Sequence, residues 1–387
     1  MTRRLFAILS LMAAVVILSA VMSGIWGTTP EKVSVVSGID YSVDMTVREF
    51  ANRNGLPEQL VAQIFSVRSD EGLNQTIGSF GYSEKEALKQ VNRALALSQE
   101  YRSKNWSKIP LKFALWALFL AFVFLLFRYK HVTAKTRFPL YITAIAVFGI
   151  LLGADPSPMG TVKDAIVLYG TSGAVFPPRM IALGIFILFT VAANKFICSW
   201  GCQFGTLQDL LFRINRDSKD VRGFIAQYKM PFFVSNSVRI AFFFAFSAAA
   251  VLFVVDIVEV IDPFKVFNPM MIGIAGGAFL LAIIGASFFV YRPWCHLFCP
   301  FGLVSWLFEK ISLNKITVDY DTCIACEKCA RACPTHVMNA ILKRESVIPD
   351  CFSCGTCINA CPTGSISIRS GKRARPPINK FLESRPE

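Results

Sequence analysis

Charged residues are scarce in this chain, and histidine is scarcer still. Of its 387 residues, 17% are charged and three are histidine, whereas 54% are hydrophobic. This composition excludes an ordinary soluble globular protein and is typical of proteins that span membranes. His131, His296 and His336 all lie outside the long apolar runs. Because a b-type haem needs an axial histidine or a comparable ligand, we expect no haem chain within the membrane.

Nucleotide-binding motifs are also missing. No G-x-G-x-x-G or Walker A motif stands between a strand and a helix, so the sequence does not support a nicotinamide or ATP site. The formal net charge is +14, but no nucleic-acid-binding motif accompanies it, and we expect no nucleic-acid partner. Basic loops beside anionic membrane lipid account for this charge instead.

Six apolar stretches are long enough to cross a bilayer core of about 30 Å. They are Leu5–Trp26, Leu111–Phe127, Phe138–Gly153, Met180–Trp200, Phe232–Val255 and Met270–Tyr291. The sequence therefore predicts an all-α membrane bundle of six transmembrane helices. The first stretch can instead be a secretory signal peptide, but its apolar run is long for one. We expect residues 1–26 to be an uncleaved anchor.

Basic residues concentrate in alternate loops. They are Arg3 and Arg4 before the first stretch, Arg128, Lys130, Lys135 and Arg137 after the second, and Arg213, Arg216, Lys219, Arg222 and Lys229 after the fourth. The loops 154–179 and 256–269 carry far fewer. By the positive-inside rule, this predicts a multi-pass protein of the bacterial cytoplasmic (inner) membrane. Residues 27–110 are then outside, and the chain from Arg292 onward is cytoplasmic.

The predicted outer segment, residues 27–110, contains neither cysteine nor histidine. Its apolar residues recur at helical spacing, and Ser83 with Glu86 forms a capping-box pattern, so we expect a small helical domain. This domain is either a spacer or a docking surface for an extracytoplasmic redox partner. At the other end, residues 370–387 are basic and poor in apolar residues, which predicts a disordered tail.

Eight of the twelve cysteines fall in two copies of one motif, C-x2-C-x2-C-x3-C-P. The copies are Cys323, Cys326, Cys329 and Cys333, and Cys351, Cys354, Cys357 and Cys361. In two-cluster bacterial ferredoxins, the fourth cysteine of each copy binds the other cluster. We therefore expect two 4Fe–4S clusters in a small α+β ferredoxin domain over residues 313–369. Their ligands are Cys323, Cys326, Cys329 and Cys361 for cluster 1, and Cys351, Cys354, Cys357 and Cys333 for cluster 2.

Zinc sites and disulfides are the alternatives for these eight cysteines. Zinc sites favour paired C-x2-C units without a third cysteine and a Cys-Pro ending, so the motif favours clusters. Cytoplasmic placement makes disulfides unexpected.

The other four cysteines form two C-x3-C elements that lie 97 residues apart. They are Cys198 with Cys202 and Cys295 with Cys299, and an Asp-Pro pair precedes each element at Asp155 and Asp262. Residues 111–312 are therefore predicted to contain one duplicated unit around a twofold axis. Spacing i, i+4 places both thiols of a pair on one helical face.

Four thiolates at the cytoplasmic face could hold a third iron–sulfur cluster, or another soft metal such as copper(I) or zinc. A redox dithiol pair and plain packing are the alternatives.

The Asp-Pro loops are predicted on the outer side, about 30 Å from the C-x3-C cysteines. Any quinone site is therefore expected in the inner half of the membrane. Asp155, Lys163, Asp262 and Lys265 are then interpreted as turn and interface residues.

Membrane spans with two C-x3-C elements before a two-cluster ferredoxin resemble the NapH/NosR/CcoG-type membrane ferredoxin family. The resemblance covers residues 111–369. It implies quinol-linked electron transfer to periplasmic nitrate reductase, activation of nitrous-oxide reductase, or cytochrome oxidase assembly. Members commonly show C-x3-C-P in both elements; Cys299-Pro300 conforms, whereas Gln203 follows Cys202.

Three functions remain open on the sequence alone. The first is an electron-transfer subunit of a quinol-linked oxidoreductase system, which relays electrons between the quinone pool or a membrane redox partner and a partner oxidoreductase. The second is a maturation factor that reduces or delivers a metal centre such as copper to a respiratory enzyme. The third, an anchor with purely structural clusters, is the weakest, because paired clusters with crossed ligands suit a relay.

Overall fold

The computed structural model describes residues 2–26, 36, 38–67, 69–217, 220–221, 223–343, 345–378 and 380–381, with backbone alone for residues 2–9. Residues 27–35 of the predicted outer segment, residues 382–387 of the tail, Lys219 and Arg222 lie outside the described residues. So do the side chains of Arg3 and Arg4.

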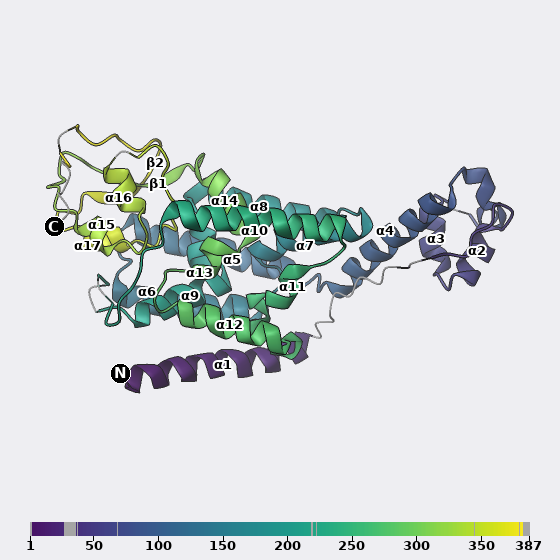
Figure 1. Cartoon of the computed structure of the whole chain (residues 1–387), viewed down its shortest axis with the longest axis horizontal. Helices are drawn as coiled ribbons and strands as arrows, with labels where there is room; N and C mark the ends of the chain where they lie inside the picture. The colour runs from purple at the N-terminus through teal and green to yellow at the C-terminus, as the bar shows by residue number, and fades with distance from the viewer. Residues whose placement is uncertain are drawn as a thin grey trace.

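A helical bundle forms the middle of the molecule (Figure 1). Its α-helices are α1 (Thr2–Trp26), α5 (Lys108–Arg128), α6 (Ala134–Ala144), α7 (Pro158–Ser172), α8 (Pro177–Ala193), α9 (Gln203–Ile214), α10 (Phe232–Leu252), α11 (Ile257–Ile261), α12 (Ile274–Ala286), α13 (Pro293–Leu297) and α14 (Pro300–Glu309). Two π-helical segments, η3 (Ile145–Leu151) and η4 (Ile197–Gly201), and two 3₁₀ turns, η5 (Pro263–Phe267) and η6 (Pro269–Met271), join them.

Three helical segments of the described chain are long and apolar enough to cross a membrane: Lys108–Arg128, Ala134–Leu151 and Phe232–Leu252. The described chain also has three shorter apolar helices, Ser10–Ile25, Pro177–Ala193 and Ile274–Ala286. Each predicted stretch thus contains a helix, but some end early. At 1.5 Å per residue, α12 is only about 20 Å long, so a crossing by all six stays a prediction.

Helix α8 ends at Ala193, before the predicted end of its stretch at Trp200. Asn194 has a positive φ of 56° and breaks the helix. Its backbone N–H donates to Ser312 Oγ at 2.7 Å, which satisfies the polar backbone at the break. The break turns the chain toward the first C-x3-C element, so hydropathy alone made this stretch too long.

Helix α7 was not predicted, because the segment 154–179 was interpreted as an outer loop. Ser157 caps α7 by accepting a hydrogen bond from Gly160 N at 3.0 Å, and Pro158 occupies the first turn. The helix packs against α8, α10 and α14. A Cβ on Gly170 would lie 2.3 Å from the Ala250 carbonyl oxygen, so α7 and α10 touch through their backbones. The loop therefore re-enters the bundle.

A second, smaller helical unit lies at one end of the bundle (Figure 1). It contains α2 (Val47–Arg53), α3 (Glu58–Ile64), α4 (Glu84–Ser103) and the short turns η1 (Gly72–Asn74) and η2 (Ile77–Phe80). The predicted capping box of Ser83 and Glu86 is present at the start of α4. Phe50, Val61 and Val91 are buried in a core of its own.

The ferredoxin segment lies at the opposite end of the bundle (Figure 1). Strands β1 (Asn314–Val318) and β2 (Ile366–Ser370) pair antiparallel, with Asn314 opposite Ser370. Between them lie three one-turn helices, α15 (Lys328–Ala332), α16 (Val337–Leu342) and α17 (Thr356–Ala360). The cysteine loops precede α15 and α17.

Candidate functional site

Two cavities in the ferredoxin segment are each lined by four cysteines. The first is lined by Cys323, Cys326, Cys329 and Cys361. The second is lined by Cys333, Cys351, Cys354 and Cys357. The fold therefore brings the cysteines together in the two crossed sets that the motif predicted.

The two cysteine loops share one backbone conformation. Ala325 and Glu327 have positive φ in the first loop, and Ser353 and Gly355 have positive φ at the matching positions of the second. Left-handed residues turn the chain tightly, so the three cysteines of a loop can surround one cavity. Gly355 is needed for a second reason, because a Cβ there would lie 2.5 Å from the Phe127 ring on α5.

The chemistry of these cavities fits iron–sulfur clusters. Each holds four thiols within a mainly apolar lining, with Ile366 in the first and Ile316 and Met338 in the second. Among the described residues, no three His, Cys, Asp or Glu side chains lie close enough to hold a single metal ion. A cubane has four irons and needs more widely spaced ligands. When bound, such a cluster accepts and releases one electron at a time.

Threonine hydroxyls lie beside three of the thiols. Thr335, Thr356 and Thr363 each place Oγ1 at 3.6 Å from a cysteine Sγ, those of Cys333, Cys354 and Cys361. Hydrogen bonds to ligand sulfurs are among the features that set a cluster's potential. Sequence analysis missed these threonines, although two of them share the spacing Cys-Pro-Thr.

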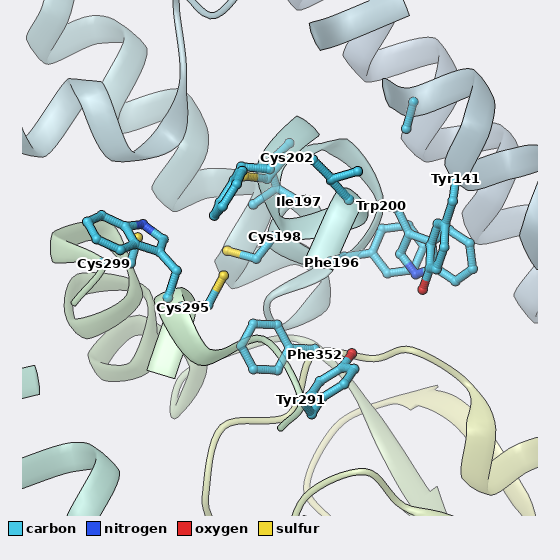
Figure 2. Packing of buried hydrophobic residues seen from close by; sticks show 14 of the residues in the cluster. Tyr141, Phe196, Ile197, Cys198, Trp200, Cys202, Tyr291, Cys295, Cys299 and Phe352 are labelled. Carbon is cyan, nitrogen blue, oxygen red and sulfur yellow. The ribbon is translucent and has the colours of Figure 1, made fainter. Parts of the chain in front are cut away.

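The remaining four cysteines meet inside the bundle. Cys198, Cys202, Cys295 and Cys299 are each 8% exposed, and Figure 2 shows the thiols of Cys198 and Cys295 pointing toward one another. A charge on Cys299 would interact with the other three sulfurs. We call this group the four-cysteine site.

The two halves of the four-cysteine site have matching backbones. Cys202 and Cys299 have φ, ψ of −73°, 114° and −68°, 116°, and each is the residue before a helix, α9 and α14. A Cβ on Gly205 or Gly302 would lie 2.6 Å from the carbonyl oxygen of Cys198 or Cys295, respectively. The prediction that each pair occupies one helical face was therefore wrong, because a helix break separates the two cysteines of each pair.

The four-cysteine site lies near mid-depth of the bundle, not at one face as predicted. Trp116 Nε1 donates to Gly201 O at 2.9 Å, and Trp116 is about 12 Å along α5 from Lys108. On the other side, Phe298 packs on Phe279, in the middle of α12, with ring centroids 5.8 Å apart. Both contacts place the residues next to Cys202 and Cys299 beside the middle of a helix.

The predicted separation of about 30 Å between the Asp-Pro loops and these cysteines is also wrong. Gln203, next to Cys202, donates through Nε2 to Ala154 O at 2.7 Å. Phe264 of the second loop packs on Phe204 with ring centroids 5.8 Å apart. Both loops fold back into the bundle, which removes the argument that placed a quinone site in the inner half.

The charged loop residues form a buried network. Lys163 Nζ is 3.3 Å from Asp262 and also pairs with Asp164 and Asp256. Asp262 also caps the start of η5 by accepting a hydrogen bond from Phe264 N at 2.9 Å. At the end of η5, the backbone carbonyl of Lys265 accepts a hydrogen bond from Asn268 N. The interpretation of Lys163 and Asp262 as interface residues agrees with this pairing, which joins the two loops.

Two cations brace the four-cysteine site, and sequence analysis missed both. Lys195 and Arg292 are fully buried and lie 97 residues apart, three residues before each C-x3-C element. Arg292 donates to the carbonyls of Cys198 and Ser199, whereas Lys195 donates to Gly302 O at 2.8 Å. Each cation thus holds the loop of the other half. Comparing the two halves at the 97-residue spacing would have found the pair.

Basic loop residues dock the ferredoxin onto the bundle. Arg137, Arg213 and Arg216 all bind the carboxylate of Asp220, which also accepts from Thr356 Oγ1 at 3.0 Å. Arg137 donates to Cys354 O at 2.8 Å. Burial alone would raise the pKa of Asp220, but the three guanidinium groups hold it well below its usual range. Residues predicted only as positive-inside charges therefore fix the ferredoxin in place.

Replacing Asp220 by asparagine should loosen this docking. Arg137 and Arg216 would lose their carboxylate, and Arg213 would keep only Asp209. Breaking a buried ion pair typically costs about 3–5 kcal/mol. We expect faster proteolysis and hydrogen exchange of residues 313–369 in D220N. Glu345, which is exposed on the ferredoxin, offers the control E345Q, which should behave as wild type.

The same network predicts a pH dependence. The folded pKa of Asp220 is depressed, so its stabilisation is complete above the unfolded value of about 3.9 and is lost as the pH falls toward the folded value. D220N should be less sensitive to pH in this acid range. Equal acid sensitivity of D220N and wild type would contradict this assignment.

Comparisons with known proteins agree with the chemistry of the cysteines. Residues 315–362 match a family described as a 4Fe-4S dicluster domain, and residues 175–219 and 272–318 both match a family described as a 4Fe-4S binding domain. The second family thus covers both C-x3-C elements. No solved structure matches the chain.

Two curated proteins are similar to parts of the chain. One is an Escherichia coli protein named "Putative electron transport protein YccM", 26% identical over 43% of this chain and 49% of its own length. The other is the uncharacterized protein MJ0749 of Methanocaldococcus jannaschii, 24% identical over 51% of this chain and 71% of its own length. The similarity to the first spans about half the length of that relative. Together, these findings support an iron–sulfur electron-transport protein of the membrane.

Proposed function

We propose that the chain relays single electrons through three iron–sulfur centres between a membrane redox partner, or the quinone pool, and a partner oxidoreductase. One observation carries this proposal: three sets of four cysteines lie in the bundle and in the ferredoxin docked on it. The four-cysteine site is buried inside the bundle, and the cavity with Cys333 and Cys351 is also lined by Tyr291 of the bundle. The cavity with Cys323 and Cys361 is lined only by residues from Val318 to Phe381.

The third centre at the four-cysteine site rests on its internal repeat. Matching backbones at Cys202 and Cys299, matching glycines at Gly205 and Gly302, and one 4Fe-4S family over both halves support a pseudo-twofold site. A bound cluster would supply one-electron chemistry there. Four thiolates carry a large negative charge, and the buried cations Lys195 and Arg292 would offset it in a low dielectric.

The chain's own residues would exclude water and fix the distances between centres. Trp200 packs on Phe127 and donates to Ser353 O at 3.3 Å, which ties the first C-x3-C element to the ferredoxin loop. The Asp220 network holds the same loop through Cys354 O. A relay with docked, immobile centres avoids the reorganisation that a swinging domain would need.

The distribution of basic residues among the loops determines the membrane orientation that we propose. We propose that the ferredoxin faces the cytoplasm of a bacterium, and that the unit containing α2–α4 faces outward and can receive an extracytoplasmic partner. Gln203, next to Cys202, is hydrogen-bonded to Ala154 in the first Asp-Pro loop, which lies on the α4 side of the bundle. We propose that electrons enter or leave the four-cysteine site from this side.

A reporter fused after Arg369 tests this orientation. The positive-inside rule predicts that a cytoplasmic reporter is active at this position and a periplasmic reporter is inactive. A second fusion within residues 103–107, between α4 and α5, serves as the control and should show the opposite pattern. An active periplasmic reporter after Arg369 would reverse the proposed sidedness.

The function itself is tested by electron transfer in membranes. Anaerobic membrane vesicles that contain the chain should reduce its clusters when a quinol is added, as followed by electron paramagnetic resonance (EPR). Clusters that no quinol reduces would remove the quinone pool as donor. A deletion that affects only the maturation of one metalloenzyme would favour the alternative function in metal-centre assembly.

A further inference from the structure

The two ferredoxin loops differ at one matched position. Ile324 follows Cys323 in the first loop and is 64% exposed, whereas Phe352 follows Cys351 in the second loop and is 4% exposed. Motif position therefore does not explain the burial of Phe352. Its side chain is buried because it leaves the ferredoxin and enters the bundle.

The Phe352 ring lies between two buried cations. The Arg292 guanidinium carbon is 5.0 Å from the ring centroid and the Lys195 Nζ is 5.4 Å from it, distances typical of cation–π contacts. The rings of Tyr291 and His296 complete the surroundings, with centroids 5.8 Å and 5.2 Å away. Each cation also has an acid partner, Asp209 for Arg292 at 2.7 Å and Asp350 for Lys195 at 3.1 Å.

These cations belong to the four-cysteine site. Arg292 holds the carbonyl of Cys198, and Lys195 holds Gly302. The Phe352 ring thus contacts a cation from each half of the repeat, and Figure 2 shows the ring on the ferredoxin side of the Cys198 and Cys295 thiols. Its own backbone is bonded directly to Cys351, which lines the cavity of cluster 2.

We propose that Phe352 is the contact through which an electron passes between the four-cysteine site and cluster 2. This inference rests on the proposed third centre. The transfer moves one electron: the centre at one site is oxidised and the centre at the other is reduced, with no bond made and no proton moved. The closely packed ring gives a continuous path of atoms, whereas a smaller side chain would leave a gap that slows tunnelling.

The test uses the full-length protein with its clusters. F352L removes the aromatic ring while retaining an apolar side chain, and F352Y retains the ring. Iron content and EPR spectra establish first that each variant holds the same centres as wild type. After rapid addition of dithionite below stoichiometry, freeze-quench EPR follows how the electron redistributes between the third signal and the ferredoxin signals. I324L is the matched control at the exposed position of the other loop.

We expect redistribution in F352L to be several-fold slower than in wild type, with unchanged reduction potentials, and F352Y and I324L to match wild type. Wild-type kinetics in F352L would overturn the role of Phe352 while leaving the third centre in place. If F352L loses iron, F352M replaces it, since methionine is flexible and fills gaps. Loss of iron in every variant that lacks the ring would make Phe352 a folding residue and overturn the proposal. Absence of a third signal in wild type would instead contradict the proposed function.

Discussion

Replacement of Cys357 by alanine is expected to remove one ferredoxin cluster and to destabilise the whole ferredoxin segment. Cys357 is buried at the start of α17 and lines the second cysteine cavity with Cys333 and Cys351. Ligation free energy is folding free energy in small metal domains, where it is on the order of 10 kcal/mol. The crossed sets extend the effect, because Cys361 directly follows the same helix and lines the other cavity.

Iron content, EPR and thermal unfolding measure this effect. C357A should lose about half of the ferredoxin iron, and the remaining cluster should be more labile. C329A should behave in the same way from the other cavity. Asn359, which is exposed on α17, provides the control N359A, which should keep its iron. Full iron content in C357A would show that these cysteines are not cluster ligands.

Serine replacements in the four-cysteine site should have the second largest effect. C198S, C202S, C295S and C299S should each lose the same third EPR signal and block electron transfer, because each thiolate would bind one iron of the proposed shared centre. The ferredoxin clusters should remain, since their ligands lie in separate cavities.

Ser199 gives the matched control for these variants. It is fully buried beside Cys198, and its hydroxyl has no hydrogen-bond partner among the described residues. S199A should therefore retain the third signal. If the serine variants keep full metal content and activity, the four cysteines bind no metal and only pack in the core. A reversible two-electron titration without iron would identify a redox dithiol instead.

The grouping of the ferredoxin cysteines into two crossed sets could be predicted from the sequence, because the motif places three closely spaced cysteines with a fourth from the other copy. The surroundings of the clusters could not. Phe352 and Ile324 occupy the same motif position, yet one is buried and the other exposed. Only the docking of one loop against the bundle distinguishes them, and docking depends on Asp220 and its arginines, far away in the sequence.

The depth of the four-cysteine site was also beyond the sequence. The stretch from Met180 to Trp200 is apolar on both sides of Asn194 and Lys195, so it was predicted as one span, but the backbone breaks at Asn194. The re-entry of α7 was missed because its residues are only moderately apolar and follow an Asp-Pro pair that suggested a surface turn. The 97-residue repeat did predict which cysteines meet, and it extends to Lys195 and Arg292.

The most direct test of this account is the iron content of the anaerobically purified full-length chain, measured together with its EPR spectrum on reduction. The account predicts about twelve irons per chain, four for each of three clusters, with a third signal that is lost in C198S and C295S. About eight irons per chain, with an EPR spectrum that both serine variants leave unchanged, would contradict it.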